Sequence, residues 1–136
     1  LKSVYIEKYK NLSPLTIDFE LGNGLTMLVG NNGSGKSNVL EAISGIFHDL
    51  FKGKDSRKIK CDYKLQYTLN EINCVIEQTN GFLRCYGPKF KRREYFIEEN
   101  APHNIIGLYS GEEDRLWTSF YETYYKSYPE PQKSAK

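Results

Sequence analysis

Two glycines, a lysine and a serine stand at a fixed spacing in the first third of the chain. The run is Gly30-Asn31-Asn32-Gly33-Ser34-Gly35-Lys36-Ser37, which fits the pattern G-x-x-x-x-G-K-[ST]. Polyphosphate oxygens need several backbone N–H groups at once, and glycines with a positive φ let a backbone approach them. Lys36 is placed to reach β- and γ-phosphates, and the Ser37 hydroxyl is placed to bind Mg²⁺. The pattern therefore predicts a nucleoside triphosphate site.

The segments on either side of this run should position it. Leu25 to Val29 is apolar and predicts a short buried strand that leads into the loop. The residues after the loop predict a helix that ends near Lys52 and Gly53, with its positive dipole end at the phosphates. Apolar residues recur there at spacings of three and four, while Glu41, Ser44 and Asp49 face elsewhere; the apolar set is Val39, Leu40, Ile43, Ile46, Phe47 and Leu50.

Alternating patterns predict strands before and after this unit. Residues 4–9 and the set Leu15, Ile17 and Phe19 alternate apolar with polar, with a turn at residues 10–14 between them. Residues 59–86 return to a period of two, and Asn80-Gly81 is a strong hairpin signal. We therefore expect an antiparallel pair near the N-terminus and a three-stranded meander over residues 59–86.

The C-terminal third carries a basic cluster and a second helix signal. The cluster comprises Lys89, Lys91, Arg92 and Arg93. It could contact nucleic-acid phosphates, or it could be a solvated loop that protects a sheet edge, and the second interpretation is preferred. Residues 104–109 predict a buried strand, and Ser110 to Glu113 predicts a capping box at the start of a helix. Residues 1–128 should form one unit, with residues 129–136 a disordered tail or a linker.

The bulk composition narrows the class of protein. The chain has 136 residues and a net charge of +2, which is too small to announce nucleic-acid binding by itself. Its three cysteines are odd in number and lack a C-x-x-C pair, so they read as reduced packing residues of a cytoplasmic protein. No apolar stretch is long enough to span a bilayer, and no secretion signal precedes the first strand.

Residues 30–43, which continue the loop through Asn38 to Ile43, resemble the Walker A segment of ABC-type ATPases of the SMC, RecF, RecN and OLD group. Residues 6–12 resemble that group's N-terminal strand and loop, and the closest likeness is to bacterial ATPases of restriction and anti-phage defence systems. The resemblance covers residues 1–51. It implies an α/β P-loop NTPase (ABC-ATPase-like) N-terminal part, here with an antiparallel β meander and two main helices, that binds ATP and Mg²⁺.

The same resemblance implies further site residues and partners. Lys10 and Asn11 become additional nucleotide-binding candidates, although an ordinary polar turn explains them equally well. A second head, which makes a homo-oligomer, would close over the nucleotide. Nucleic acid or an effector protein of a defence system would be the other partner.

Several elements of such an ATPase are missing. No apolar run ends in the Asp-Glu of a Walker B, which completes the Mg²⁺ shell and polarises water. Ser110 to Glu113 resembles an ABC signature superficially, but a capping box is preferred. His48 and His103 are interpreted as structural or exposed rather than as a switch histidine.

We therefore expect the ATP-Mg²⁺-binding part of an ATPase head that hydrolyses ATP only with elements supplied from elsewhere, so that these residues alone are inactive. The alternative is a nucleotide-sensing assembly module that binds ATP without significant hydrolysis. A small kinase or a GTPase is less well supported, because no N-K-x-D motif reads a guanine.

Overall fold

The computed structural model describes residues 1–19, 25–52, 57–87 and 93–102, together with residues 105 and 118. The chain divides into two compact units, Leu1–Ile105 and Ile106–Lys136, and the fold reported below is that of the first. The predicted strand at 104–109, the helix from Ser110 and the tail at 129–136 lie outside the described residues apart from Ile105 and Thr118.

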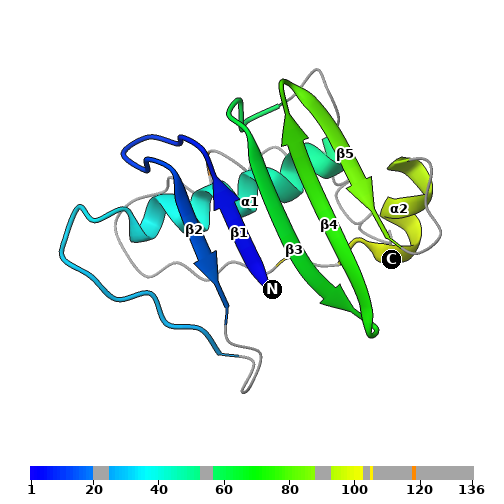
Figure 1. Ribbon diagram of the computed structural model, residues 1–136, viewed down its shortest axis with the longest axis horizontal. Coiled ribbons are helices and arrows are strands. Elements are labelled where there is room, and N and C mark those ends of the chain that lie inside the picture. Colours follow the sequence, from blue (N-terminus) through cyan, green and yellow to red (C-terminus); the bar gives the residue numbers. More distant parts are fainter. Residues whose placement is uncertain (20–24, 53–56, 88–92, 103–104, 106–117, 119–136) are drawn as a thin grey trace, which may run out of the picture. The chain divides into compact units, whose positions relative to one another are not determined.

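Five antiparallel strands form one sheet in the order β2-β1-β3-β4-β5 (Figure 1). They are β1 (Ser3–Ile6), β2 (Leu15–Asp18), β3 (Tyr63–Leu69), β4 (Ile72–Thr79) and β5 (Phe82–Tyr86). The meander predicted over residues 59–86 is confirmed as β3, β4 and β5, and its second hairpin turns at Asn80 and Gly81, which both have positive φ. β1 joins this meander to β2 because Val4 lies opposite both Ile17 and Leu65.

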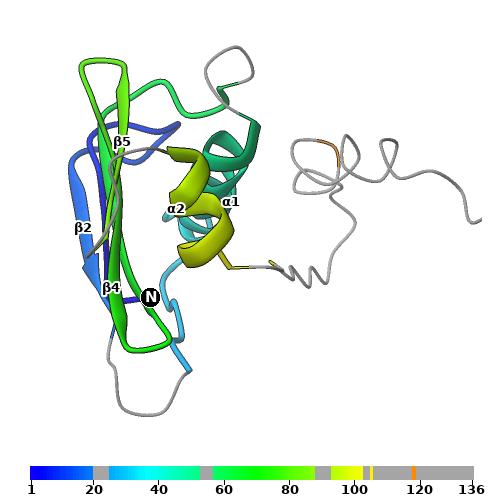
Figure 2. The same ribbon diagram turned by 90° about the vertical axis from the view of Figure 1, so that its right-hand side faces the viewer.

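In the described part of the chain, two helices cover one face of the sheet, as Figure 2 shows. They are α1 (Lys36–Lys52) and α2 (Arg93–Asn100). Alternate residues of the central strands point toward the helices, so the core lies between the two layers. The buried apolar side chains that fill it are Val4, Ile6, Leu12, Val39, Ala42, Ile46, Phe47, Leu50, Ile59, Tyr63, Leu65, Tyr67, Cys74, Ile76, Phe96 and Ala101.

Tyr67 of β3 contacts both helices and so links them to the sheet. Its ring lies 5.8 Å from that of Phe47 on α1, at an interplanar angle of 59°, a tilted arrangement that aromatic pairs favour. Its hydroxyl donates to the carbonyl of Asn100 at the end of α2, at 2.7 Å. A tyrosine is suited to this position because its ring packs in the core while its hydroxyl satisfies a buried carbonyl.

The strand predicted at residues 25–29 is wrong. The segment from Leu25 to Val29 has no sheet partner among the described residues, and it runs alone into the glycine loop (Figure 1). The side chains of Leu25, Met27 and Val29 are 76%, 74% and 81% exposed. An apolar run indicates side chains that need to be buried against another element. The described part of the chain does not contain an element that buries these three side chains.

The predicted helix is confirmed at α1, including its end at Lys52, but the predicted faces need correction. Leu40, assigned to the apolar face, is 49% exposed. Glu41 and Asp49, assigned to the opposite side, are both buried. Asp49 accepts hydrogen bonds from the backbone N–H groups of Lys58 and Ile59, at 2.7 and 2.9 Å, which satisfies its charge.

Three smaller findings complete the comparison with the sequence. The cysteines, Cys61, Cys74 and Cys85, are all free thiols, as predicted. His48 is buried beside Asp49, with its Nδ1 at 3.1 Å from a carboxylate oxygen, which fits the structural interpretation. No helix in the described part of the chain is long and apolar enough to cross a membrane.

Candidate nucleotide-binding site

The glycine loop ends where α1 begins, and two of its glycines have a backbone conformation that other residues rarely adopt. The φ angle is 81° at Gly33 and 98° at Gly35. The loop is also folded tightly on itself, because a Cβ on Gly30 would lie 2.8 Å from the hydroxyl oxygen of Ser34. The sequence therefore places glycine where the loop needs positive φ and where it needs space.

The Lys36 side chain folds back across the loop. Its Nζ donates to the carbonyl oxygens of Gly30 and Asn31, at 2.7 Å each. A lysine ammonium has three donors and no acceptor, so it can exchange such carbonyls for the stronger acceptor that a phosphate oxygen provides. Ser37 follows in the first turn of α1 and is exposed, as a residue that takes a ligand from solvent must be. Together with the helix N-terminus, this arrangement suits an anion.

The turn between β1 and β2 lies directly on the loop. Asn11 donates from its side-chain nitrogen to the carbonyl of Gly33 at 2.8 Å. Asn38, on the first turn of α1, donates in turn to the side-chain oxygen of Asn11 at 2.6 Å. The structure thus brings Asn11 and Asn38 together with the loop, although they are 27 residues apart in the chain.

Lys10 is engaged by a residue that the sequence interpretation placed outside the site. Its Nζ lies 2.6 Å from both carboxylate oxygens of Glu41 on α1. The Lys10 side chain is 40% exposed, whereas that of Glu41 is 6% exposed. The ion pair therefore has one partly exposed member and one buried member. The neighbouring Tyr9 has its pKa raised, first by burial and then by the negative charge of Glu41.

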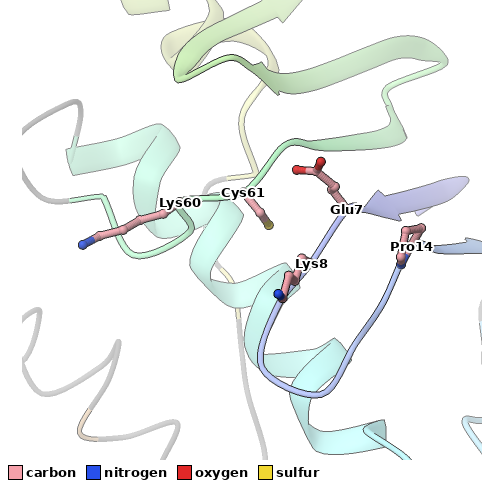
Figure 3. A pocket seen from close by; sticks show the side chains of 5 residues that line it. All are labelled: Glu7, Lys8, Pro14, Lys60 and Cys61. Atoms are coloured by element: carbon pink, nitrogen blue, oxygen red, sulfur yellow. The ribbon is translucent and has the colours of Figure 1, made fainter.

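A pocket of about 510 Å³ adjoins the same turn, between its two arms and the segment that precedes β3 (Figure 3). The residues that line it are Glu7, Lys8, Pro14, Lys60 and Cys61, and the Lys60 side chain extends away from the other four. The lining contains one carboxylate, two lysines and no glycine. The features that suit phosphate therefore belong to residues 30–38 and not to this pocket.

Arg93 is the one residue of the basic cluster that the structure describes, and it contacts α1 and not the glycine loop. Arg93 donates from Nε at 2.9 Å and also from Nη2 to the carbonyl of Leu50, at the end of α1, so it fastens α2 to that helix. Lys89, Lys91 and Arg92 lie outside the described residues. Within the described ranges, no group of three or more His, Cys, Asp and Glu side chains could hold a metal ion.

The residue that sequence reasoning missed is Glu41. A glutamate within an apolar helix surface was the available signal, because a buried carboxylate needs a partner. The periodicity of α1 gives no information about that partner, which comes from Lys10, 31 residues earlier.

A glycine loop with this spacing, at the N-terminus of a helix that packs on a sheet, defines a P-loop NTPase. A family model described as "AAA domain" matches residues 3–120. The chain belongs to this family.

The curated relatives agree with that assignment. The chain is 46% identical over 46 residues to "Retron Ec83 probable ATPase" of Escherichia coli, a match that covers 33% of this chain and 8% of the relative. It is 38% identical over 71 residues to "DNA replication and repair protein RecF" of Actinobacillus succinogenes, covering 52% and 19%. It is 36% identical over 77 residues to "DNA double-strand break repair Rad50 ATPase" of Methanosarcina mazei, covering 47% and 7%.

These relatives confirm the resemblance to the SMC and RecF group of ATPases, in their N-terminal part. The chain spans less than a fifth of the length of each of these three relatives. Their similarity supports an ATP-binding ATPase family for this chain.

Proposed function

We propose that residues 30–38 bind ATP together with Mg²⁺, and that the chain is the nucleotide-binding part of an SMC/RecF-like ATPase head. The observation that carries this proposal is the position of the Lys36 ammonium, 2.7 Å from two carbonyls of a glycine loop at the start of α1. The cation already lies against the backbone of the loop, and the helix dipole adds to its field.

Each part of the loop has a separate task in holding the nucleotide. The positive φ angles of Gly33 and Gly35 expose backbone N–H groups to phosphate oxygens. Lys36 binds phosphate oxygens as a point charge, and the Ser37 hydroxyl binds Mg²⁺. When bound, Mg²⁺ neutralises charge on the phosphate oxygens. Lys10 and Asn11 add contacts from the turn that lies on the loop.

We further propose that hydrolysis needs a Walker B and a signature loop from outside the described residues. The apolar side chains of residues 25–29 support this, because their exposure calls for a neighbouring strand. Glu41, the carboxylate bonded within the site, has both oxygens on Lys10 and is not poised to act on water. The relatives' much greater length leaves room for the missing elements.

That engagement of Glu41 also favours a second candidate function. In a nucleotide-sensing assembly module, ATP would order an oligomer without significant hydrolysis, and no poised carboxylate would be required. The two candidates share the same binding site and differ in whether phosphate is released.

The proposed partners follow from the names of the relatives. DNA replication and repair, DNA double-strand break repair and a retron ATPase all point to nucleic acid or to an anti-phage defence effector. A second head would make a homo-oligomer. Nucleic acid would contact the other three residues of the basic cluster, Lys89, Lys91 and Arg92, in the cytoplasm, since Arg93 contacts α1.

A nucleotide titration of the complete protein tests these proposals. Lys36→Ala removes charge-assisted hydrogen bonds that contribute about 1.5 to 3 kcal/mol each, so Mg²⁺-dependent ATP affinity should fall by roughly tenfold or more. Lys64→Ala is the matched control, because Lys64 is an exposed lysine of β3. Equal binding by wild type and Lys36→Ala would overturn the proposed site.

Phosphate release separates the two candidate functions. The ATPase predicts release from the complete protein that Lys36→Ala abolishes, whereas the assembly module predicts tight binding with no release above that variant's background.

A further inference from the structure

Glu41 is a charged group held inside the protein, and its carboxylate is paired with the Lys10 ammonium. The residue is 4% exposed and lies on α1, between the apolar core residues Val39 and Ala42. A carboxylate in such a place is costly unless it is paired and hydrogen-bonded. Both of its oxygens receive the Lys10 ammonium at 2.6 Å. The pair therefore ties the turn between β1 and β2 to the helix that follows the glycine loop.

The turn is held in a strained conformation at the point where this pair forms. Lys10 has a φ of 52°, which is uncommon for a residue with a side chain. Tyr9 and Leu12 exchange backbone hydrogen bonds across it, at 3.1 and 2.8 Å. Strain of this kind persists where the surroundings over-determine it, and Glu41 is one of the anchors that do so.

The other anchor of the turn is the glycine loop itself. Asn11 donates to the carbonyl of Gly33, and Leu12 fills the space that the missing Cβ of Gly35 leaves. A displacement of Lys10 would therefore move the two residues that contact the loop.

We propose that Glu41 is a positioning residue of the nucleotide site. It acts through Lys10: the carboxylate fixes the ammonium and the turn, and the turn holds Gly33 and Gly35 in the conformation that meets phosphate. This inference rests on the proposed function and adds to it a residue that does not touch the nucleotide.

The test measures ATP affinity and thermal stability in the complete protein for Glu41→Gln, Lys10→Met and their combination. Each single variant should weaken Mg²⁺-ATP binding by about three- to tenfold, and the double variant should bind no more weakly than Lys10→Met, because Glu41 acts only through Lys10. Lys10→Arg should retain affinity, since a guanidinium also matches a carboxylate at two atoms.

Asp49→Asn is the matched control for mere destabilisation. Asp49 is a buried carboxylate on the same helix, and it binds backbone N–H groups of Lys58 and Ile59 instead of the turn. It should lower the melting temperature while the folded protein keeps its ATP affinity. A Glu41→Gln protein that binds ATP like wild type, or effects of the two single variants that add in full, would overturn the inference.

The Lys36→Ala protein separates this inference from the proposed function. If Lys36→Ala weakens ATP binding and Glu41→Gln does not, the positioning role fails and the nucleotide site stands. If Lys36→Ala binds ATP like wild type, the nucleotide site fails, and the positioning role fails with it.

Discussion

Leu12 occupies the space that the missing side chain of Gly35 leaves: a Cβ on Gly35 would lie 2.6 Å from Leu12 Cδ2 and 3.1 Å from the side-chain oxygen of Asn11. A glycine is therefore required at position 35 for two reasons, the φ of 98° and this close approach. The contact also means that the turn between β1 and β2 and the glycine loop cannot move independently. The loop's shape is set by a segment more than 20 residues earlier in the chain.

Gly35→Ala should destabilise the protein and abolish nucleotide binding. An alanine at this φ and a clash with Leu12 should together cost about 2 to 4 kcal/mol. Chemical denaturation and a nucleotide titration measure the two effects. A variant as stable as wild type would show that the turn yields easily, which would contradict the coupling.

Gly33 and Gly81 provide the matched comparison for that experiment. Both have positive φ, at 81° and 76°, and a Cβ on either would meet nothing within 4 Å. Gly33→Ala and Gly81→Ala should therefore lose similar stability, roughly 1 kcal/mol from backbone strain alone. Gly33→Ala alone should weaken ATP binding, because Gly81 lies in the hairpin between β4 and β5.

At position 11, substitution by aspartate should lower the ATP affinity more than substitution by alanine. Asn11→Ala loses one bond to Gly33 and one from Asn38, so ATP affinity should fall by about three- to tenfold. Asn11→Asp cannot donate to the Gly33 carbonyl and adds a negative charge beside the phosphate site, so its loss should be larger and should shrink at high salt.

The same titration decides whether Asn11 is more than a polar turn residue. Asn73→Ala is the control, since Asn73 also accepts a side-chain hydrogen bond, from Lys2 at 2.7 Å, but lies on β4. Equal ATP affinity in wild type, Asn11→Asp and Asn73→Ala would remove Asn11 from the site.

Local patterns predicted the parts of the fold that depend on neighbours in sequence. The alternation along β3 and β4 and the Asn80-Gly81 turn were sufficient for the meander, because side-chain direction in a strand has a period of two. The glycine loop was equally readable, since its conformation depends on residue types within eight positions.

Contacts between segments that are distant in the sequence could not be predicted from such local patterns. Glu41 and Asp49 were placed outside because their charge suggests solvent, but their partners come from Lys10 and from the backbone at Lys58 and Ile59. The helix α2 was not predicted, because its buried positions are Phe96 and Asn100 and one of them is polar. An apolar periodicity requires more than one such residue.

Arg93 should behave as a structural residue and not as part of a nucleic-acid site. Arg93→Ala removes a guanidinium that donates to the Leu50 carbonyl from two nitrogens, so the free energy of unfolding should fall by about 1.5 to 3 kcal/mol. Neutralising Lys91 and Arg92 should instead weaken nucleic-acid binding and lower its dependence on salt. An Arg93→Ala protein with unchanged stability and reduced nucleic-acid affinity would reverse this assignment.

Cys85 should make the protein less stable as the pH rises above 9. Burial raises the pKa of the Cys85 thiol from its ordinary value near 9 to about 11, against a smaller opposing effect of the Arg93 charge. Between these values the unfolded chain releases a proton that the folded chain keeps, so ionisation favours unfolding. The stability that this thiol contributes is complete below pH 9 and is lost as the pH rises through 11.

Denaturation of wild type and of Cys85→Ala at pH 8 and pH 11 measures this effect. The difference in unfolding free energy between the two proteins should shift against the wild type by about 1 to 2 kcal/mol over that range, since one pKa unit corresponds to about 1.4 kcal/mol. The larger part of the tyrosine contribution cancels, because the pKa values of Tyr63 and Tyr67 are raised first by burial and both residues remain in both proteins; the smaller effect of the Cys85 charge on them is lost in the variant. A difference that stays constant with pH would show that the Cys85 thiol is solvated and that burial does not raise its pKa.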